Sequence, residues 1–231
     1  MALEKLRRRW EAALQPVLKA FDGISPATVT WMALPLGVAG GLLAMYAPNT
    51  ATGGWWLLGG AFMIGLAMIF DGLDGSLARA RGEVTRWGDY LDHTIDRVLD
   101  ATWVVCLSAS VFVADIALGF AAAFLTLLGS YMGTQAQAVA GSRNYRGFSR
   151  ADRTVITLLG YISMAIMLFI GWESDLMYPA MFDHIALNPI SLVVFISALG
   201  GIWTFLVRFQ QAKGDIQALD ISEPLEQPKR E

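Results

Sequence analysis

The sequence contains few charged residues and a single cysteine. Only 16% of its 231 residues are Asp, Glu, Lys or Arg, whereas a soluble domain contains roughly 25%, so the composition argues against an ordinary soluble enzyme. One cysteine, Cys106, can form neither an internal disulfide nor a Cys-rich zinc site. The net charge is only −3 and there is no basic tract, which argues against nucleic-acid binding.

Apolar residues dominate the chain instead. Hydrophobic residues make up 55% of it and the mean hydropathy is +0.48, which excludes an intrinsically disordered protein. The 23 Gly and 8 Trp fit a polytopic membrane protein, because Gly is frequent in membrane helices and Trp is enriched at membrane interfaces.

Six segments are apolar enough to form membrane-spanning helices of about 20 residues. They are residues 27–47, 53–70, 98–114, 116–140, 155–172 and 187–207. All 17 Lys and Arg lie in four stretches that this map places on one side of the membrane, and the loops on the other side contain none. The positive-inside rule therefore predicts an all-α integral membrane protein of the cell membrane with both termini in the cytoplasm.

Three regions follow from this map. In residues 1–24, apolar side chains recur at helical spacing and basic residues lie between them, which predicts an amphipathic helix on the cytoplasmic leaflet. A cytosolic helix packed on the protein is the alternative. Residues 25–210 form the six-helix transmembrane domain, and residues 211–231 form a polar C-terminal tail, which we expect to be unstructured after about Asp215.

Two pairs of aspartates flank the predicted cytoplasmic turn between the second and third spans. Asp71 and Asp74 are three residues apart, and Asp92 and Asp96 are four apart, so each pair shares one face of a helix. The polar stretch 81–86 between the pairs is so short that the two helices must run antiparallel. The four carboxylates can then converge at the cytoplasmic edge of the membrane.

Four carboxylates in one place repel one another unless a cation neutralises them. Oxygen ligands favour a hard ion, Mg²⁺ or Mn²⁺ and less so Ca²⁺, in a site of one or two ions that also takes a substrate phosphate. The alternative is that the acids solvate a loop or pair with nearby Arg. His93 lies beside Asp92, but its position on the helix predicts that its side chain points away from the aspartate face.

The pattern D-x2-D-G-x2-A-R-x8-G-x3-D-x3-D covers both pairs. It comprises Asp71, Asp74, Gly75, Ala78, Arg79, Gly88, Asp92 and Asp96. This pattern resembles the signature of the CDP-alcohol phosphatidyltransferase family. The resemblance implies a homodimeric integral membrane enzyme, active at the cytoplasmic side, in which an alcohol attacks the β-phosphorus of a CDP-linked lipid and releases CMP.

The resemblance also implies roles for these residues. The metal ligands would be Asp71, Asp74, Asp92 and Asp96, and Asp96 would also be the catalytic base. The CDP-lipid would be bound by Gly75, Ala78, Arg79 and Gly88.

Four arginines between residues 143 and 153 suggest the acceptor. They could clamp a phosphate through charge-assisted, planar hydrogen bonds, or they could only anchor the topology. The stretch resembles the branch of the family that uses inositol phosphate, especially archaeal archaetidylinositol phosphate synthases. This implies that Arg150 and Arg153, and then Arg143, bind the acceptor phosphate. Bacterial phosphatidylinositol phosphate synthases tend to carry Lys and Arg where this chain has Gly133 and Gln135, which is a departure.

The predicted reaction is transfer of a diacylglycerol- or archaeol-type phosphate from a CDP-lipid to inositol 1-phosphate. Glycerol 3-phosphate is the alternative acceptor, as in a phosphatidylglycerophosphate synthase, and serine is less favoured because it needs a carboxylate site. Two other classes compete with this interpretation. A transporter would place acids at mid-bilayer on separate segments, and an aspartate-rich membrane prenyltransferase would carry its acidic motifs on separate helix pairs.

Overall fold

A computed structural model describes residues 21, 23–141, 146–172 and 175–224 of the chain. In these residues the structure has six α-helices and one short 3₁₀ helix. They are α2 (Pro26–Met45), α3 (Ala51–Arg81), α4 (Arg86–Ala109), α5 (Ile116–Ala140), α6 (Arg150–Ile170), η1 (Ala180–Phe182) and α7 (Pro189–Ser222). The all-helical prediction is confirmed for the described residues, whereas the helix predicted over residues 1–24 lies almost entirely outside them.

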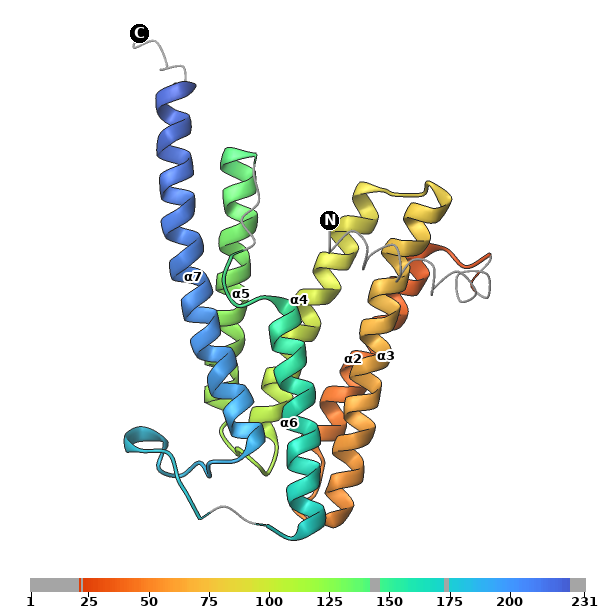
Figure 1. Ribbon diagram of the computed structural model, residues 1–231, viewed down its shortest axis with the longest axis vertical. Coiled ribbons are helices and arrows are strands. Elements are labelled where there is room, and N and C mark those ends of the chain that lie inside the picture. Colours follow the sequence, from red (N-terminus) through yellow and green to blue (C-terminus); the bar gives the residue numbers. More distant parts are fainter. Residues whose placement is uncertain (1–20, 22, 142–145, 173–174, 225–231) are drawn as a thin grey trace, which may run out of the picture.

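The helices form one bundle in which successive helices run in opposite directions (Figure 1). α2 packs against α3 and α4, α5 packs against α4 and α7, and α6 packs against α3 and α7. The turn between α3 and α4 lies at the same end of the bundle as the C-terminal ends of α5 and α7 (Figure 1). That end carries the predicted site.

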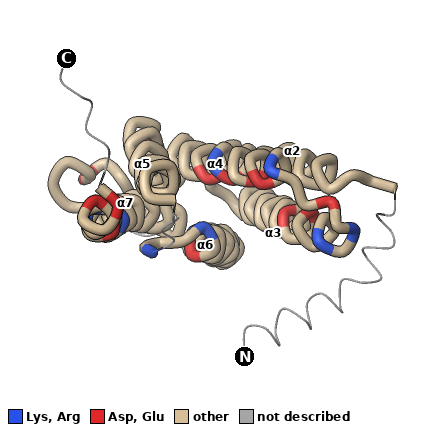
Figure 2. The backbone as a smooth tube through the Cα atoms, turned by 90° about the horizontal axis from the view of Figure 1, so that it is seen from above, with Lys and Arg blue, Asp and Glu red and all other residues tan. Residues whose placement is uncertain are grey.

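Five of the six helices are long and apolar enough to cross a membrane: α2, α3, α5, α6 and α7. α4 is not among them, because the half of this helix nearest the α3–α4 turn carries charged side chains. Figure 2 looks down the bundle from that end and shows acidic and basic residues on α3, α4, α6 and α7, whereas α2 and α5 carry none. The five long apolar helices therefore make the chain an integral membrane protein. The count of six spans stays a prediction.

Several helix ends differ from the predicted spans, because local capping rather than hydropathy fixes them. α4 ends at Ala109 instead of residue 114, since Ser110 is extended and its hydroxyl donates to the carbonyl of Leu107. α6 begins five residues early at Arg150, because Ser149 and Asp152 form a capping box. α7 continues to Ser222, so the prediction that the tail is unstructured after Asp215 is wrong for these residues.

Glycines on α2 allow the neighbouring helices to approach its backbone. A Cβ atom at Gly37 would lie 2.5 Å from the side chain of Leu99, a distance that packed carbon atoms do not reach. The carbonyls of two buried glycines accept hydrogen bonds from buried aromatic residues, at 2.8 Å from Trp103 Nε1 to Gly37 and at 3.1 Å from the Tyr161 hydroxyl to Gly40. These bonds fix α4 and α6 on α2.

The loops at the end of the bundle away from the α3–α4 turn are tied together through Asp115. Its Oδ1 accepts from the backbone N–H of Leu118 at 2.9 Å, which caps α5, and its Oδ2 lies 3.1 Å from His184 Nε2 in the α6–α7 loop. The Leu118 N–H, and then the His184 ring, hold the pKa of Asp115 below its ordinary value of 3.8.

Replacing Asp115 with Ala should lower the free energy of unfolding by about 1 kcal/mol, because α5 loses its cap. Since the folded pKa is the lower one, this stabilisation is present at neutral pH and is lost as the pH falls through the folded pKa. Apparent melting temperatures in detergent at pH 7, with Asp115→Asn as the variant that keeps a capping oxygen, measure the effect. An Ala variant as stable as the wild type would contradict it.

Candidate active site

The four predicted aspartates lie on the α3–α4 hairpin. Gly82 ends α3 in the left-handed region at φ 69°, and Thr85 begins α4 by accepting from the N–H of Gly88 at 3.0 Å. The short turn makes the two helices antiparallel (Figure 1), as predicted. It therefore places Asp71 and Asp74 of α3 at the same level of the bundle as the first turns of α4.

Asp92, His93 and Asp96 form a group that could hold a metal ion. Their ligand atoms all lie within 4.8 Å of one another. The prediction that His93 points away from the aspartates is therefore wrong. Its ring leans toward the preceding turn, as helical side chains do, which brings Nε2 to 3.5 Å from Asp89 and Nδ1 to 3.9 Å from Asp92.

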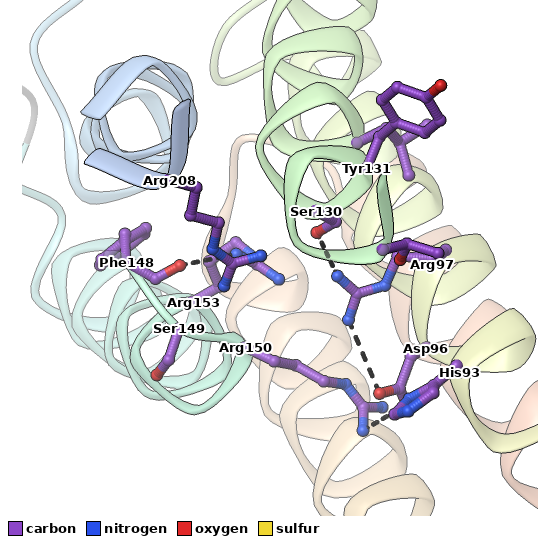
Figure 3. Close-up of a pocket in the computed structure, with 12 residues that line it drawn as sticks. His93, Asp96, Arg97, Ser130, Tyr131, Phe148, Ser149, Arg150, Arg153 and Arg208 are labelled. Atoms are coloured by element: carbon purple, nitrogen blue, oxygen red, sulfur yellow. Dashed lines mark hydrogen bonds and ion pairs between the residues drawn. The ribbon is translucent and has the colours of Figure 1, made fainter. Parts of the chain in front are cut away.

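Arg150 of α6 joins the carboxylates of both hairpin helices. Its Nη1 lies 2.8 Å from Asp71 Oδ2 and 2.5 Å from Asp96 Oδ1, and Figure 3 shows its side chain extending across to Asp96 and His93. Asp71 Oδ1 and the Nε and Nη2 atoms of Arg150 are buried without a hydrogen-bond partner in the described part of the chain. The residue predicted to bind acceptor phosphate thus reaches the carboxylates themselves.

Asp74 is oriented by α2. The hydroxyl of Thr30 donates to Asp74 Oδ2 at 2.5 Å, and the backbone N–H of Gly75 donates to Oδ1. The side chain is therefore held from two sides. Sequence reasoning missed Thr30, since one Thr within an apolar span carries no signal of its own.

A cavity of about 560 Å³ lies between α2, α3 and α4, and we call it the α3–α4 cavity. All four residues predicted to bind the CDP-lipid line it, together with two of the aspartates. These are Gly75, Ala78, Arg79, Gly88, Asp74 and Asp92. Gly75 has a steric role, because a Cβ atom there would lie 3.1 Å from Arg79 Nη1. A larger residue would push the guanidinium aside.

A second cavity, of about 450 Å³, lies between α4, α5, α6 and α7, and we call it the arginine cavity. Four arginines line it together with Asp96 (Figure 3): Arg97, Arg150, Arg153 and Arg208. Arg150 and Arg153 were predicted for this role, whereas the third predicted residue, Arg143, lies outside the described residues. Arg97 and Arg208 were missed, because in the sequence these two residues were used only to assign the membrane topology.

Asp100 was also missed. Its side chain is fully buried, and its Oδ2 lies 2.6 Å from Arg153 Nη2 and 3.3 Å from Arg97 Nη2. A signal existed in the sequence, since this residue falls inside the predicted span 98–114 and an acid within a span is costly unless it has a partner. Asp100 belongs to neither of the two spaced aspartate pairs, so the spacing pattern did not include it.

The two cavities meet at one group of carboxylates. Asp92 lines the α3–α4 cavity and Asp96 lines the arginine cavity, and their carboxylate oxygens lie within 4.8 Å of each other. Ligands in the two cavities would therefore come together at the aspartates.

Two known proteins are similar to this chain in sequence. The phosphatidylinositol phosphate synthase of Cutibacterium acnes is 29% identical over 166 residues, which are 68% of this chain and 76% of that protein. The archaetidylinositol phosphate synthase of Pyrococcus horikoshii is 37% identical over 139 residues, 56% of this chain and 63% of that protein.

The fold is also similar to a solved structure. The Mycobacterium tuberculosis phosphatidylinositol phosphate synthase with CDP-DAG bound superposes with a TM-score of 0.65 at 24% identity, over 85% of this chain and 92% of that one. The same protein has been solved in complex with manganese and citrate.

The match that decides the family is broader than any of these pairs. Residues 24–206 match the family described as CDP-alcohol phosphatidyltransferase. This range contains the whole α3–α4 hairpin and all of the six α-helices except the end of α7. The chain therefore belongs to the CDP-alcohol phosphatidyltransferase family and is a transferase of phospholipid synthesis.

Proposed function

We propose that this transferase moves the phosphatidyl-type group of a CDP-lipid, with a diacylglycerol or archaeol tail, to a hydroxyl of inositol 1-phosphate and releases CMP. The observation that carries the proposal is the pair of cavities on either side of one carboxylate group, with four arginines lining one of them. Two relatives named for inositol phosphate products support the same acceptor.

The donor set of the hairpin fits a hard divalent cation. Four carboxylates supply oxygen ligands, and Asp71 Oδ1 is buried without a partner in the described residues. We propose that Asp71, Asp74, Asp92 and Asp96 hold one or two Mg²⁺ or Mn²⁺ ions. When bound, such an ion supplies the positive charge that neutralises the diphosphate and stabilises CMP as the leaving group.

The protein's own residues would position the two substrates. Gly75, Ala78, Arg79 and Gly88 would bind the cytidine diphosphate in the α3–α4 cavity. Asp96 lines the arginine cavity, so it can accept the proton of an acceptor hydroxyl bound there. The acceptor oxygen then forms a bond to the β-phosphorus, the bond from that phosphorus to the CMP oxygen breaks, and the proton stays on Asp96.

The arginine cavity suits an acceptor that carries a phosphate. Arg150 and Arg153, and as the next candidate Arg143, would bind the phosphate through bidentate contacts. Arg97 and Arg208 add two guanidinium groups to the same cavity, which offsets the departure at Gly133 and Gln135. Glycerol 3-phosphate remains the second candidate, because it carries the same phosphate.

An acceptor screen tests this proposal. Purified protein with a CDP-lipid and Mg²⁺ or Mn²⁺ is given inositol 1-phosphate, glycerol 3-phosphate, serine or free inositol, and CMP release is measured. We expect kcat/KM for inositol 1-phosphate to exceed that for free inositol by about a hundredfold or more, because free inositol lacks the phosphate that the arginines would bind through charge-assisted hydrogen bonds. Preference for serine or free inositol would overturn the acceptor assignment.

We propose that the protein is a homodimer, as the family resemblance implies. We also propose that the active site faces the cytoplasm. Cysteine labelling tests the orientation in a Cys106→Ala background, using Val84→Cys in the α3–α4 turn and Met181→Cys in the α6–α7 loop. Both native side chains are well exposed, at 68% and 76%. A membrane-impermeant reagent should label the first only from the cytoplasmic side and the second only from outside. Labelling of both from one side would contradict the topology.

A further inference from the structure

One buried carboxylate lies between two arginines of the arginine cavity. Asp100 of α4 has a fully buried side chain, and its Oδ2 accepts from Arg153 of α6 at 2.6 Å while lying 3.3 Å from Arg97 Nη2. A single oxygen atom therefore contacts two guanidinium groups. These contacts also join α4 to α6.

Asp100 cannot itself touch a substrate. It is absent from the lining of the arginine cavity, whereas Arg97 and Arg153 both line it. The space on the other side of Asp100, shared with Thr126 and Thr157, is only about 10 Å³, which is room for about one water molecule. Any effect of this carboxylate on the reaction must act through the two arginines.

Within the part of the chain that the structure describes, each of these arginines makes one further hydrogen bond. Arg153 Nη1 donates to the carbonyl of Phe148 at 3.0 Å, and Arg97 Nη1 donates to the hydroxyl of Ser130 (Figure 3). Neither acceptor carries a charge. Asp100 therefore supplies the closest negative charge to both guanidiniums, and it offsets the repulsion between them in a site of low dielectric constant.

Loss of this charge would also affect the carboxylates of the hairpin. Arg97 Nη2 already lies 3.6 Å from Asp96 Oδ2. Without Asp100, this guanidinium would be drawn toward Asp96 and out of the orientation that Asp100 gives it. Among the described residues, Arg153 would keep only its bond to the Phe148 carbonyl.

We infer that Asp100 is a positioning residue for the acceptor: it holds the guanidinium groups of Arg153 and Arg97 in the orientation that binds the acceptor's phosphate. The inference rests on the proposed function, because it needs a phosphorylated acceptor in the arginine cavity. It adds a residue that no spacing pattern indicates.

A double-mutant cycle tests the inference. Asp100→Asn keeps the shape of the side chain but removes its charge, and we expect it to raise the KM for inositol 1-phosphate roughly tenfold while the KM for the CDP-lipid stays unchanged. Arg153→Ala should raise the same acceptor KM. If Asp100 acts through Arg153, the double variant will be much less impaired than the product of the two single effects.

Ser108→Ala is the matched control. Ser108 is equally buried and lies eight residues further along α4, and we expect wild-type KM values for both substrates. If Asp100→Asn fails to fold, the cycle is run with Asp100→Glu, which keeps the charge but moves the carboxylate by one methylene.

The outcomes separate this inference from the proposed function. If the wild type prefers another phosphorylated acceptor, the inositol assignment fails and the same cycle is measured with that acceptor. A wild-type acceptor KM for Asp100→Asn, effects that multiply in the double variant, or an equal rise in the KM of the CDP-lipid would each overturn the positioning role. A wild-type preference for an acceptor that carries no phosphate would also overturn the positioning role.

Discussion

Replacing Asp71 or Asp92 with Asn is expected to reduce CMP release by about a thousandfold or more. Asp71 has one oxygen bound to Arg150 and the other buried without a partner in the described residues, and Asp92 belongs to the group that could hold a metal ion. An amide at either position keeps the volume but removes a charged oxygen ligand. Divalent cations should then bind weakly.

Two measurements distinguish a variant that has lost activity from one that no longer folds. Size-exclusion chromatography in detergent shows whether each variant still folds, and Mn²⁺ binding to the purified protein is measured without any substrate. Asp220→Asn is the control, since this residue is exposed near the end of α7. Full activity in EDTA, or wild-type Mn²⁺ binding and turnover in either variant, would contradict the metal assignment.

Replacing Arg150 with Ala is expected to raise the KM of the acceptor by about tenfold to a hundredfold, because one or two charge-assisted hydrogen bonds to phosphate are lost. The KM of the CDP-lipid should change little, since Arg150 does not line the α3–α4 cavity. Arg150→Lys should be intermediate, because it keeps the charge but loses the planar fork.

Mn²⁺ binding gives an independent measure of the same variant. The guanidinium of Arg150 lies against Asp71 and Asp96, so it competes with a cation for those oxygens. Arg150→Ala should therefore bind Mn²⁺ at least as tightly as the wild type. Arg86→Ala is the control, since Arg86 is exposed and lines neither cavity. A wild-type acceptor KM for Arg150→Ala would show that its contacts are structural only.

The sequence predicted the helices well where polar caps coincide with the ends of apolar segments. α5 matches its predicted bounds because Asp115 caps its start and Gly141 ends it in the left-handed region. α3 and α7 continue far beyond their apolar segments, because hydropathy reports where the membrane ends and not where the helix ends. The capping box at Ser149 was a local signal that the hydropathy pattern obscured.

The candidate site was predictable where its residues share one helix face. The two aspartate pairs and the small residues between them could be found by spacing alone. Thr30, Arg97, Asp100 and Arg208 could not be placed in this way, because they reach the site from three helices, α2, α4 and α7, through contacts that only the folded bundle brings together. Of these four residues, only Asp100 carries a signal in the sequence, because it is a charged residue within a predicted apolar span.

The carboxylate hairpin is proposed to join a CDP-lipid to a phosphorylated acceptor. The most direct test of this role is to supply inositol 1-[³²P]phosphate with a CDP-lipid and a divalent cation, and to measure both labelled lipid and free CMP. We expect equal amounts of the two products, and neither product in EDTA. CMP release without label in the lipid, or labelled lipid formed in EDTA, would contradict it.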